Sequence, residues 1–100
     1  MRFLYLYLMK DAPERVQSTA LKHPAYWSDL GLRGYLGGPF ADRFGGLIAF
    51  QAASGVGAAQ LVANDPFLAE GLLERHWVKE SLAFRSATPT ADLPTSATLS

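Results

Sequence analysis

FLYLYLM, residues 3–9, is the stretch that decides the fold. It is an unbroken apolar run rich in aromatic residues, and the charged pair Lys10-Asp11 ends it. Such a run predicts a buried strand at the start of the chain. In an extended strand the aromatic residues share one face and the leucines share the other. Because both faces are apolar, we expect both to be covered.

The other elements follow from periodicity and from turn residues. An apolar stripe predicts a helix over residues 13–30, with Pro13 in its first turn and Gly31 at its end. Pro24 removes a backbone hydrogen bond inside this helix and predicts a kink. Ser54 is the expected N-cap of a second helix. The expected core positions of that helix are Val56, Ala59 and Ala63. The remaining expected elements are strands over residues 33–40, 47–52 and 72–84, a second helix over 54–63 and a short helical turn over 66–71.

The element order β-α-β-β-α-β defines the fold class as α+β. With right-handed crossovers, the simplest solution is a four-stranded antiparallel sheet with strand order 4-1-3-2 and both helices on one face. The other face stays open, and either the tyrosine side or the leucine side of the first strand must lie on it. An open apolar face predicts a homodimer that stacks two such faces. We expect Tyr5→Asp or Tyr7→Asp to weaken this dimer or to lower the solubility of the protein.

The composition limits the function. One hundred residues, 49% of them hydrophobic, make one domain with a substantial core. The net charge is zero and no basic stripe occurs, so we expect no nucleic-acid partner. There is no cysteine, and the two histidines lack carboxylates spaced for a metal, so we expect no metal site. The first apolar run is too short to span a bilayer, which indicates a cytoplasmic protein without a membrane partner. The segment 85–100, rich in Ser, Thr, Ala and Pro, is expected to be a disordered tail.

One histidine stands on the apolar stripe of the first helix. The stripe, with spacings of 4, 3, 4 and 3, consists of Val16, Ala20, His23, Trp27 and Leu30. An imidazole on this face needs partners for two ring nitrogens. Histidine changes charge near neutral pH, so His23 suits proton transfer. The plainer reading is a hydrogen-bonded core histidine, and the stripe alone leaves both readings open.

Asp65 follows the second helix and precedes Pro66 and Phe67. Asp before Pro is typical of a helix N-cap with proline at the first helical position. A functional carboxylate is the other reading. The two are compatible, since a capping carboxylate has a second oxygen free for an imidazole N–H.

Five segments of the chain occur together in one known family. They are Phe3–Tyr7, His23–Trp27, Gly37–Pro39, Ala63–Phe67 and Glu74–Val78. With these segments, residues 1–84 resemble a YCII-related (YciI-like) domain. The resemblance implies the ferredoxin-like fold of the dimeric α/β barrels, in agreement with the element order.

The resemblance also implies an active site. The recurrent His and Asp of the family match His23 and Asp65. Some relatives are linked to dehalogenation of hydroxylated aromatic ring-cleavage compounds, and the wider superfamily includes isomerases and monooxygenases that work without metals. We therefore expect a small cofactor-free enzyme, a lyase, isomerase or dehalogenase, that does acid–base chemistry on a small, aromatic-derived acid. Asp65 would fix the tautomer of His23 and stabilise its imidazolium. The alternative is a non-catalytic ligand-binding or accessory dimeric domain.

Further residues are expected around the ligand. The expected substrate-binding residues are Tyr5, Trp27, Gly38, Pro39 and Phe67. Aromatic side chains would line a pocket beside His23, and a glycine lets a ligand approach the backbone. The strand tyrosines, Tyr5 and Tyr7, have core or interface positions as their alternative reading. His76 is expected to be exposed.

Overall fold

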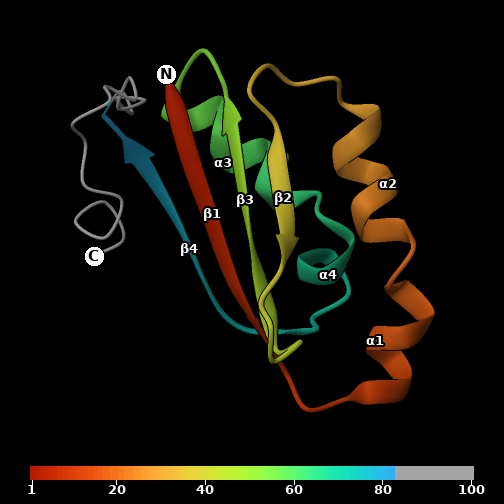
Figure 1. Ribbon diagram of the computed structural model, residues 1–100. Helices are drawn as coiled ribbons and strands as arrows, with labels where there is room; N and C mark the ends of the chain where they lie inside the picture. The colour runs from red at the N-terminus through yellow and green to blue at the C-terminus, as the bar shows by residue number, and fades with distance from the viewer. Residues whose placement is uncertain (83–100) are drawn as a thin grey trace, which may run out of the picture.

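The computed structural model describes residues 1–82, which form a four-stranded antiparallel sheet with all helices on one face (Figure 1). The strands are β1 (Arg2–Met9), β2 (Leu36–Pro39), β3 (Gly45–Gln51) and β4 (Leu73–Ser81). The helices are α1 (Pro13–Thr19), α2 (Lys22–Asp29), α3 (Gly55–Ala63) and α4 (Pro66–Ala69). The sheet order β2-β3-β1-β4 confirms the predicted order and the α+β, ferredoxin-like class. The predicted tail, residues 85–100, lies outside the described residues.

The aromatic side of β1 faces the helices. β1 lies between β3 and β4 and pairs antiparallel with both. Tyr5 is 0% and Tyr7 is 5% exposed, because both lie under the helical layer. The expectation that Tyr5→Asp or Tyr7→Asp would act at a dimer interface is therefore wrong. Either substitution would instead place a carboxylate in the core of the subunit.

The leucine side of β1 lies on the open face, which is turned toward the viewer in Figure 1. In the register of the sheet, Leu6 stands opposite Leu47 of β3 and Trp77 of β4. All three side chains are half-buried. The apolar residues of this face are Leu4, Leu6, Leu8, Leu36, Leu47, Ala49 and Trp77. Within residues 1–82, no helix covers this surface, which we call the leucine face.

The segment 13–30 forms two helices, so the predicted single helix with a kink at Pro24 is wrong. α1 closes at Ala20, whose N–H donates to the carbonyl of Gln17 at 3.3 Å. Pro24 occupies the third position of α2. The first four N–H groups of a helix have no partner inside it, so the missing N–H of proline there removes no helical bond. His23 lies next to it in the first turn of α2, and its side chain is buried.

The cap of α3 is confirmed, but its predicted core face is wrong. The Ser54 hydroxyl accepts the N–H of Gly57 at 3.0 Å. The residues that α3 buries are Ala58 and Val62, whereas Val56 is 71% exposed. Ala59 and Ala63 are exposed as well. The segment is apolar almost throughout, so its pattern does not specify which side is buried.

The strand boundaries differ from the predicted ones by at most three residues, and residues 83–84 of the predicted last strand lie outside the described residues. β2 is the shorter of the two edge strands. It spans only Leu36–Pro39, whereas the predicted strand covered residues 33–40. Pro39 is tolerated there because an edge strand has one unpaired side. β3 begins earlier than predicted, at Gly45. No helix within the described part of the chain is long and apolar enough to cross a membrane.

Candidate active site

The carboxylate of Asp65, between α3 and α4, is the centre of the candidate site. The residue is fully buried. Its Oδ1 lies 2.5 Å from Nδ1 of His23 and 3.1 Å from Nε1 of Trp27. Its Oδ2 accepts the Tyr5 hydroxyl at 2.7 Å. Donors from α2 and β1 thus satisfy a charge that burial alone would penalise.

The Asp65 side chain does not cap α4, which corrects the predicted N-cap. Only the backbone carbonyl of Asp65 joins the helix, accepting the N–H of Ala69 at 2.8 Å. Pro66, at the first helical position, has no N–H that needs a cap. The carboxylate turns into the core instead, where it accepts from Tyr5, His23 and Trp27.

His23 is held on three sides. A carboxylate can only accept, so Nδ1 carries a proton and donates it to Asp65. Nε2 lies 3.1 Å from the Tyr7 hydroxyl, which donates to it when the imidazole is neutral. The Phe67 ring stacks on the imidazole, with centroids 4.3 Å apart and an interplanar angle of 18°. The result is a chain of contacts from Tyr7 through His23 to Asp65.

The two tyrosines of this network are neutral at ordinary pH. Burial raises the pKa of Tyr7 to about 12, with further contributions from the charge of Asp65 and from Tyr35. Burial also raises the pKa of Tyr5 far above its usual range, and the charge of Asp65 and the hydrogen bond to it add to this effect. Both phenols are therefore hydrogen-bond donors near pH 7.

A cavity of about 550 Å³ lies beside His23. Its walls come from β1, both parts of the first helical segment, the β2–β3 hairpin and α4. The walls are mostly apolar, and a volume of this size is typical of small-molecule sites. The polar groups on the wall belong to Tyr7, His23, Tyr35 and Arg43.

Among residues 1–82, Arg43 is the one permanently charged residue on the cavity wall, and no carboxylate joins it there. It lies in the turn between β2 and β3, where its N–H donates to the carbonyl of Phe40 at 2.9 Å. Its φ of 68° is in the left-handed region, which disfavours residues other than glycine, asparagine and aspartate. Within residues 1–82, its guanidinium makes no hydrogen bond or ion pair. The charge is therefore available to a ligand.

The structure brings most of the predicted site residues together. His23 and Asp65 form a direct pair, and Gly38, Pro39 and Phe67 line the cavity. Tyr5 and Trp27 differ from their predicted role, because both donate to Asp65 and neither lines the cavity. His76 is exposed, as predicted.

Sequence reasoning missed Arg43 and Tyr35 and left Tyr7 undecided. Tyr7 had a signal, since it shares a strand face with Tyr5 two positions earlier. Arg43 had none, because nothing in the sequence of the turn shows that its side chain returns to the cavity. Among the described residues, no group of three His, Asp or Glu side chains is placed to hold a metal ion.

No family model matches the chain, and no curated protein matches it. Several solved structures are similar to it, including the following two. One is the 5-chloro-2-hydroxyhydroquinone dehydrochlorinase TftG from Burkholderia phenoliruptrix AC1100, in complex with 2,5-dihydroxybenzoquinone, with a TM-score of 0.71 and 23% identity over 82% of this chain and 94% of that chain. The other is Rv0793 from Mycobacterium tuberculosis, with a TM-score of 0.55 and 14% identity over 85% of this chain and 97% of that chain. Both belong to the dimeric α/β barrel superfamily, and at these identities the likeness shows the fold alone.

Proposed function

We propose that this chain is a small enzyme that does acid–base chemistry, of the lyase, isomerase or dehalogenase type, on a small aromatic-derived acid. One observation carries the proposal: an imidazole on a cavity wall is held between a buried carboxylate and a phenol. In this arrangement His23 and Asp65 form the catalytic pair. No step needs a cofactor.

The pair suits proton transfer for electrostatic reasons. Asp65 fixes the tautomer by accepting from Nδ1, which leaves Nε2 as the basic nitrogen. When Nε2 takes a proton, the adjacent carboxylate stabilises the imidazolium. A positioned acid or base of this kind contributes roughly 10²–10⁴-fold to a rate.

The cavity supports a small, flat, anionic substrate. Its apolar walls favour a ring, and the unpaired guanidinium of Arg43 favours a carboxylate or an ionised phenol. The ligand named with TftG, 2,5-dihydroxybenzoquinone, has this character and makes it a reasonable first probe. A dehydrochlorination removes H⁺ and Cl⁻ from one molecule, so it requires a base beside the substrate. The pair of His23 and Asp65 supplies such a base at the cavity wall.

The leucine face supports a homodimer. It presents a half-buried apolar stripe on β1, β3 and β4, and apolar patches of this kind are typical of interaction surfaces. Stacking two such faces would complete the α/β barrel dimer.

The test combines binding with turnover. The parent protein should bind 2,5-dihydroxybenzoquinone saturably and release chloride from 5-chloro-2-hydroxyhydroquinone. His23→Asn should lower the chloride-release rate by roughly 10²–10⁴-fold. His76→Asn is the matched control, because it removes an exposed histidine that does not line the cavity. Saturable binding without turnover of this or related halophenols would support the alternative, a non-catalytic ligand-binding domain.

A further inference from the structure

The basic nitrogen of His23 is covered. Nδ1 faces Asp65, Phe67 stacks on the ring, and the Tyr7 hydroxyl sits 3.1 Å from Nε2. His23 is 7% exposed although it lines the cavity. A ligand therefore has to meet or displace the Tyr7 hydroxyl before it reaches Nε2.

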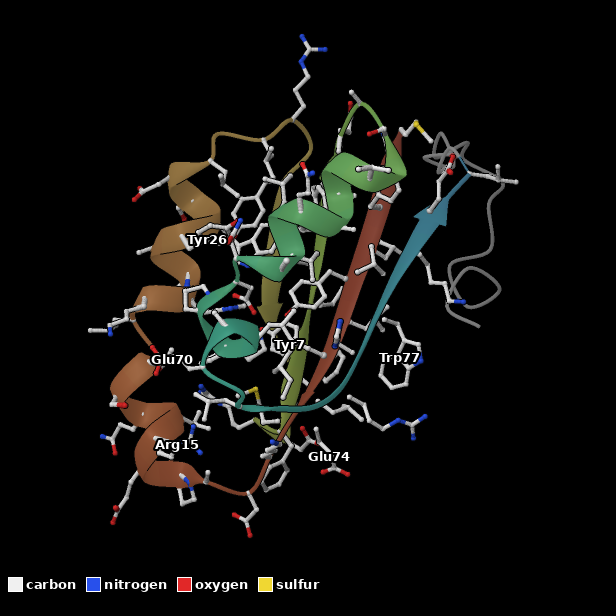
Figure 2. All side chains as sticks on the ribbon, turned by 180° about the vertical axis from the view of Figure 1, so that it is seen from behind. Tyr7, Arg15, Tyr26, Glu70, Glu74 and Trp77 are labelled. Carbon is white, nitrogen blue, oxygen red and sulfur yellow. The ribbon has the colours of Figure 1, made fainter. Side chains whose placement is uncertain are left out.

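The fold holds Tyr7 in this position. Figure 2 shows Tyr7 between the sheet and α4, close to the middle of the molecule. Beneath its ring lies Gly46 of β3, its cross-strand neighbour. A Cβ at position 46 would overlap the Tyr7 hydroxyl and would lie 2.7 Å from Tyr7 Cζ. Glycine is thus the residue that lets the phenol lie flat on β3 and point toward His23.

We infer that the Tyr7 hydroxyl is the group that exchanges a proton with the substrate, and that His23 stores that proton behind it. The inference rests on the proposed function and adds a catalytic residue to it. In the forward step, the substrate O–H or C–H bond breaks and its proton bonds to the Tyr7 oxygen. The original Tyr7 proton moves to Nε2 of His23 at the same time. The substrate keeps the electron pair, the imidazolium faces Asp65, and the reverse sequence returns the proton.

The two transfers must be coupled. With a pKa of about 12 for Tyr7, only about one phenol in 10⁵ is ionised at pH 7. Free phenolate is therefore too rare to be the resting base. If Tyr7 gives its proton to His23 at the same time as it accepts a proton from the substrate, no phenolate has to accumulate. Tyr7 serves as the contact atom and His23 as the base.

The first arm of the test needs no substrate. Diethylpyrocarbonate acylates the free nitrogen of a neutral imidazole, and peptide mass spectrometry separates His23 from His76. Tyr7→Phe should speed carbethoxylation of His23 by about fivefold to tenfold, because a buried hydrogen bond no longer blocks Nε2. His76 in the same molecule should react unchanged. An equal His23 rate in the parent and in Tyr7→Phe would overturn the inference.

The second arm uses chloride release from 5-chloro-2-hydroxyhydroquinone. Tyr7→Phe and His23→Asn should each lower kcat by at least about 10²-fold, and the double variant should fall no further, because the two residues act as a unit. Binding of 2,5-dihydroxybenzoquinone should weaken by no more than about tenfold in Tyr7→Phe, as expected for the loss of one hydrogen bond, so the fall in kcat should exceed the loss of binding. Tyr26→Phe is the control, because its hydroxyl donates to the carbonyl of Leu61, outside the cavity.

The rate in mixtures of H₂O and D₂O gives a readout that a structural role would not move. Two protons in flight predict a curved dependence of kcat on deuterium fraction in the parent. A Tyr7→Phe variant with unchanged or higher kcat would show that the hydroxyl only blocks His23, and would overturn the inference. A parent that binds the quinone but releases no chloride would contradict the proposed function for this substrate, while the carbethoxylation result would still decide the place of Tyr7.

Discussion

Oδ1 of Asp65 lies 2.5 Å from Nδ1 of His23, although 42 positions separate the two residues in the chain. Because Asp65 also accepts from Tyr5 and Trp27, the carboxylate ties β1 and α2 to the segment between α3 and α4. One residue thus supports both the candidate chemistry and the packing of the helical layer on the sheet.

Removing this carboxylate should cost much stability. Asp65→Ala leaves three buried donors without an acceptor, and we expect the free energy of unfolding to fall by about 3–5 kcal/mol. Asp65→Asn should cost less, because the amide oxygen can still accept from His23 while the amide nitrogen donates to the Tyr5 oxygen. Urea denaturation measures both changes. Asp29→Asn, which changes an exposed acid, is the control. If Asp65→Ala lowers the free energy of unfolding by less than about 1 kcal/mol, the carboxylate does not hold these elements together.

Much of this arrangement was readable from the sequence. The run over residues 3–9 indicates a central strand, and the stripe of α2 places His23 and Trp27 on one buried face, where they are found. The role of Pro24 was misread because periodicity continues across the break at Ala20–Leu21. A pattern shows which face is apolar, and it does not show whether the backbone is continuous.

Other features had no local signal. The inward side of β1 could not be chosen, since both of its faces are apolar and only packing against the helices selects the aromatic one. The partners of the Asp65 side chain could not be predicted, because an Asp before a Pro is compatible both with a helix cap and with a buried carboxylate. Arg43 reaches the cavity through a turn conformation that its side chain disfavours.

Alkaline pH should destabilise the fold in a defined window. The folded-state pKa values of Tyr5 and Tyr7 lie above the unfolded value near 10, so the folded state binds more protons above that pH. Their contribution is complete below about pH 9 and is lost as pH rises through the folded values. Between about pH 10 and 12, the free energy of unfolding should fall by about 1.4 kcal/mol per pH unit for each tyrosine.

Denaturation series at several alkaline pH values, with tyrosinate absorbance recorded in parallel, measure this slope. Tyr7→Phe removes one of the two groups and should reduce the slope by about half, since the other tyrosine remains. A stability that stays flat from pH 9 to 12 would contradict the raised pKa of both phenols.

The leucine face should control assembly. Leu6→Asp places a charge in the middle of this face, opposite Leu47 and Trp77, and should convert the proposed homodimer to a monomer. Light scattering coupled to size exclusion measures the mass. Leu21→Asp is a matched control, because Leu21 is 84% exposed in the link between α1 and α2, away from this face. An unmodified protein that stays monomeric and folded at high concentration would count against the dimer.

Arg43 should show a conflict between ligand binding and backbone stability. Arg43→Gly removes the charge from the cavity wall, so binding of 2,5-dihydroxybenzoquinone should weaken by about tenfold or more, as expected for the loss of a charge-assisted contact. Glycine accepts the φ of 68° without strain, so the free energy of unfolding should stay equal or rise by up to about 1 kcal/mol. Arg43→Lys keeps the charge and should retain part of the affinity. Calorimetric titration measures the affinity, and urea denaturation measures the free energy of unfolding. If Arg43→Gly loses stability and keeps full affinity, Arg43 stabilises the turn and does not bind the ligand.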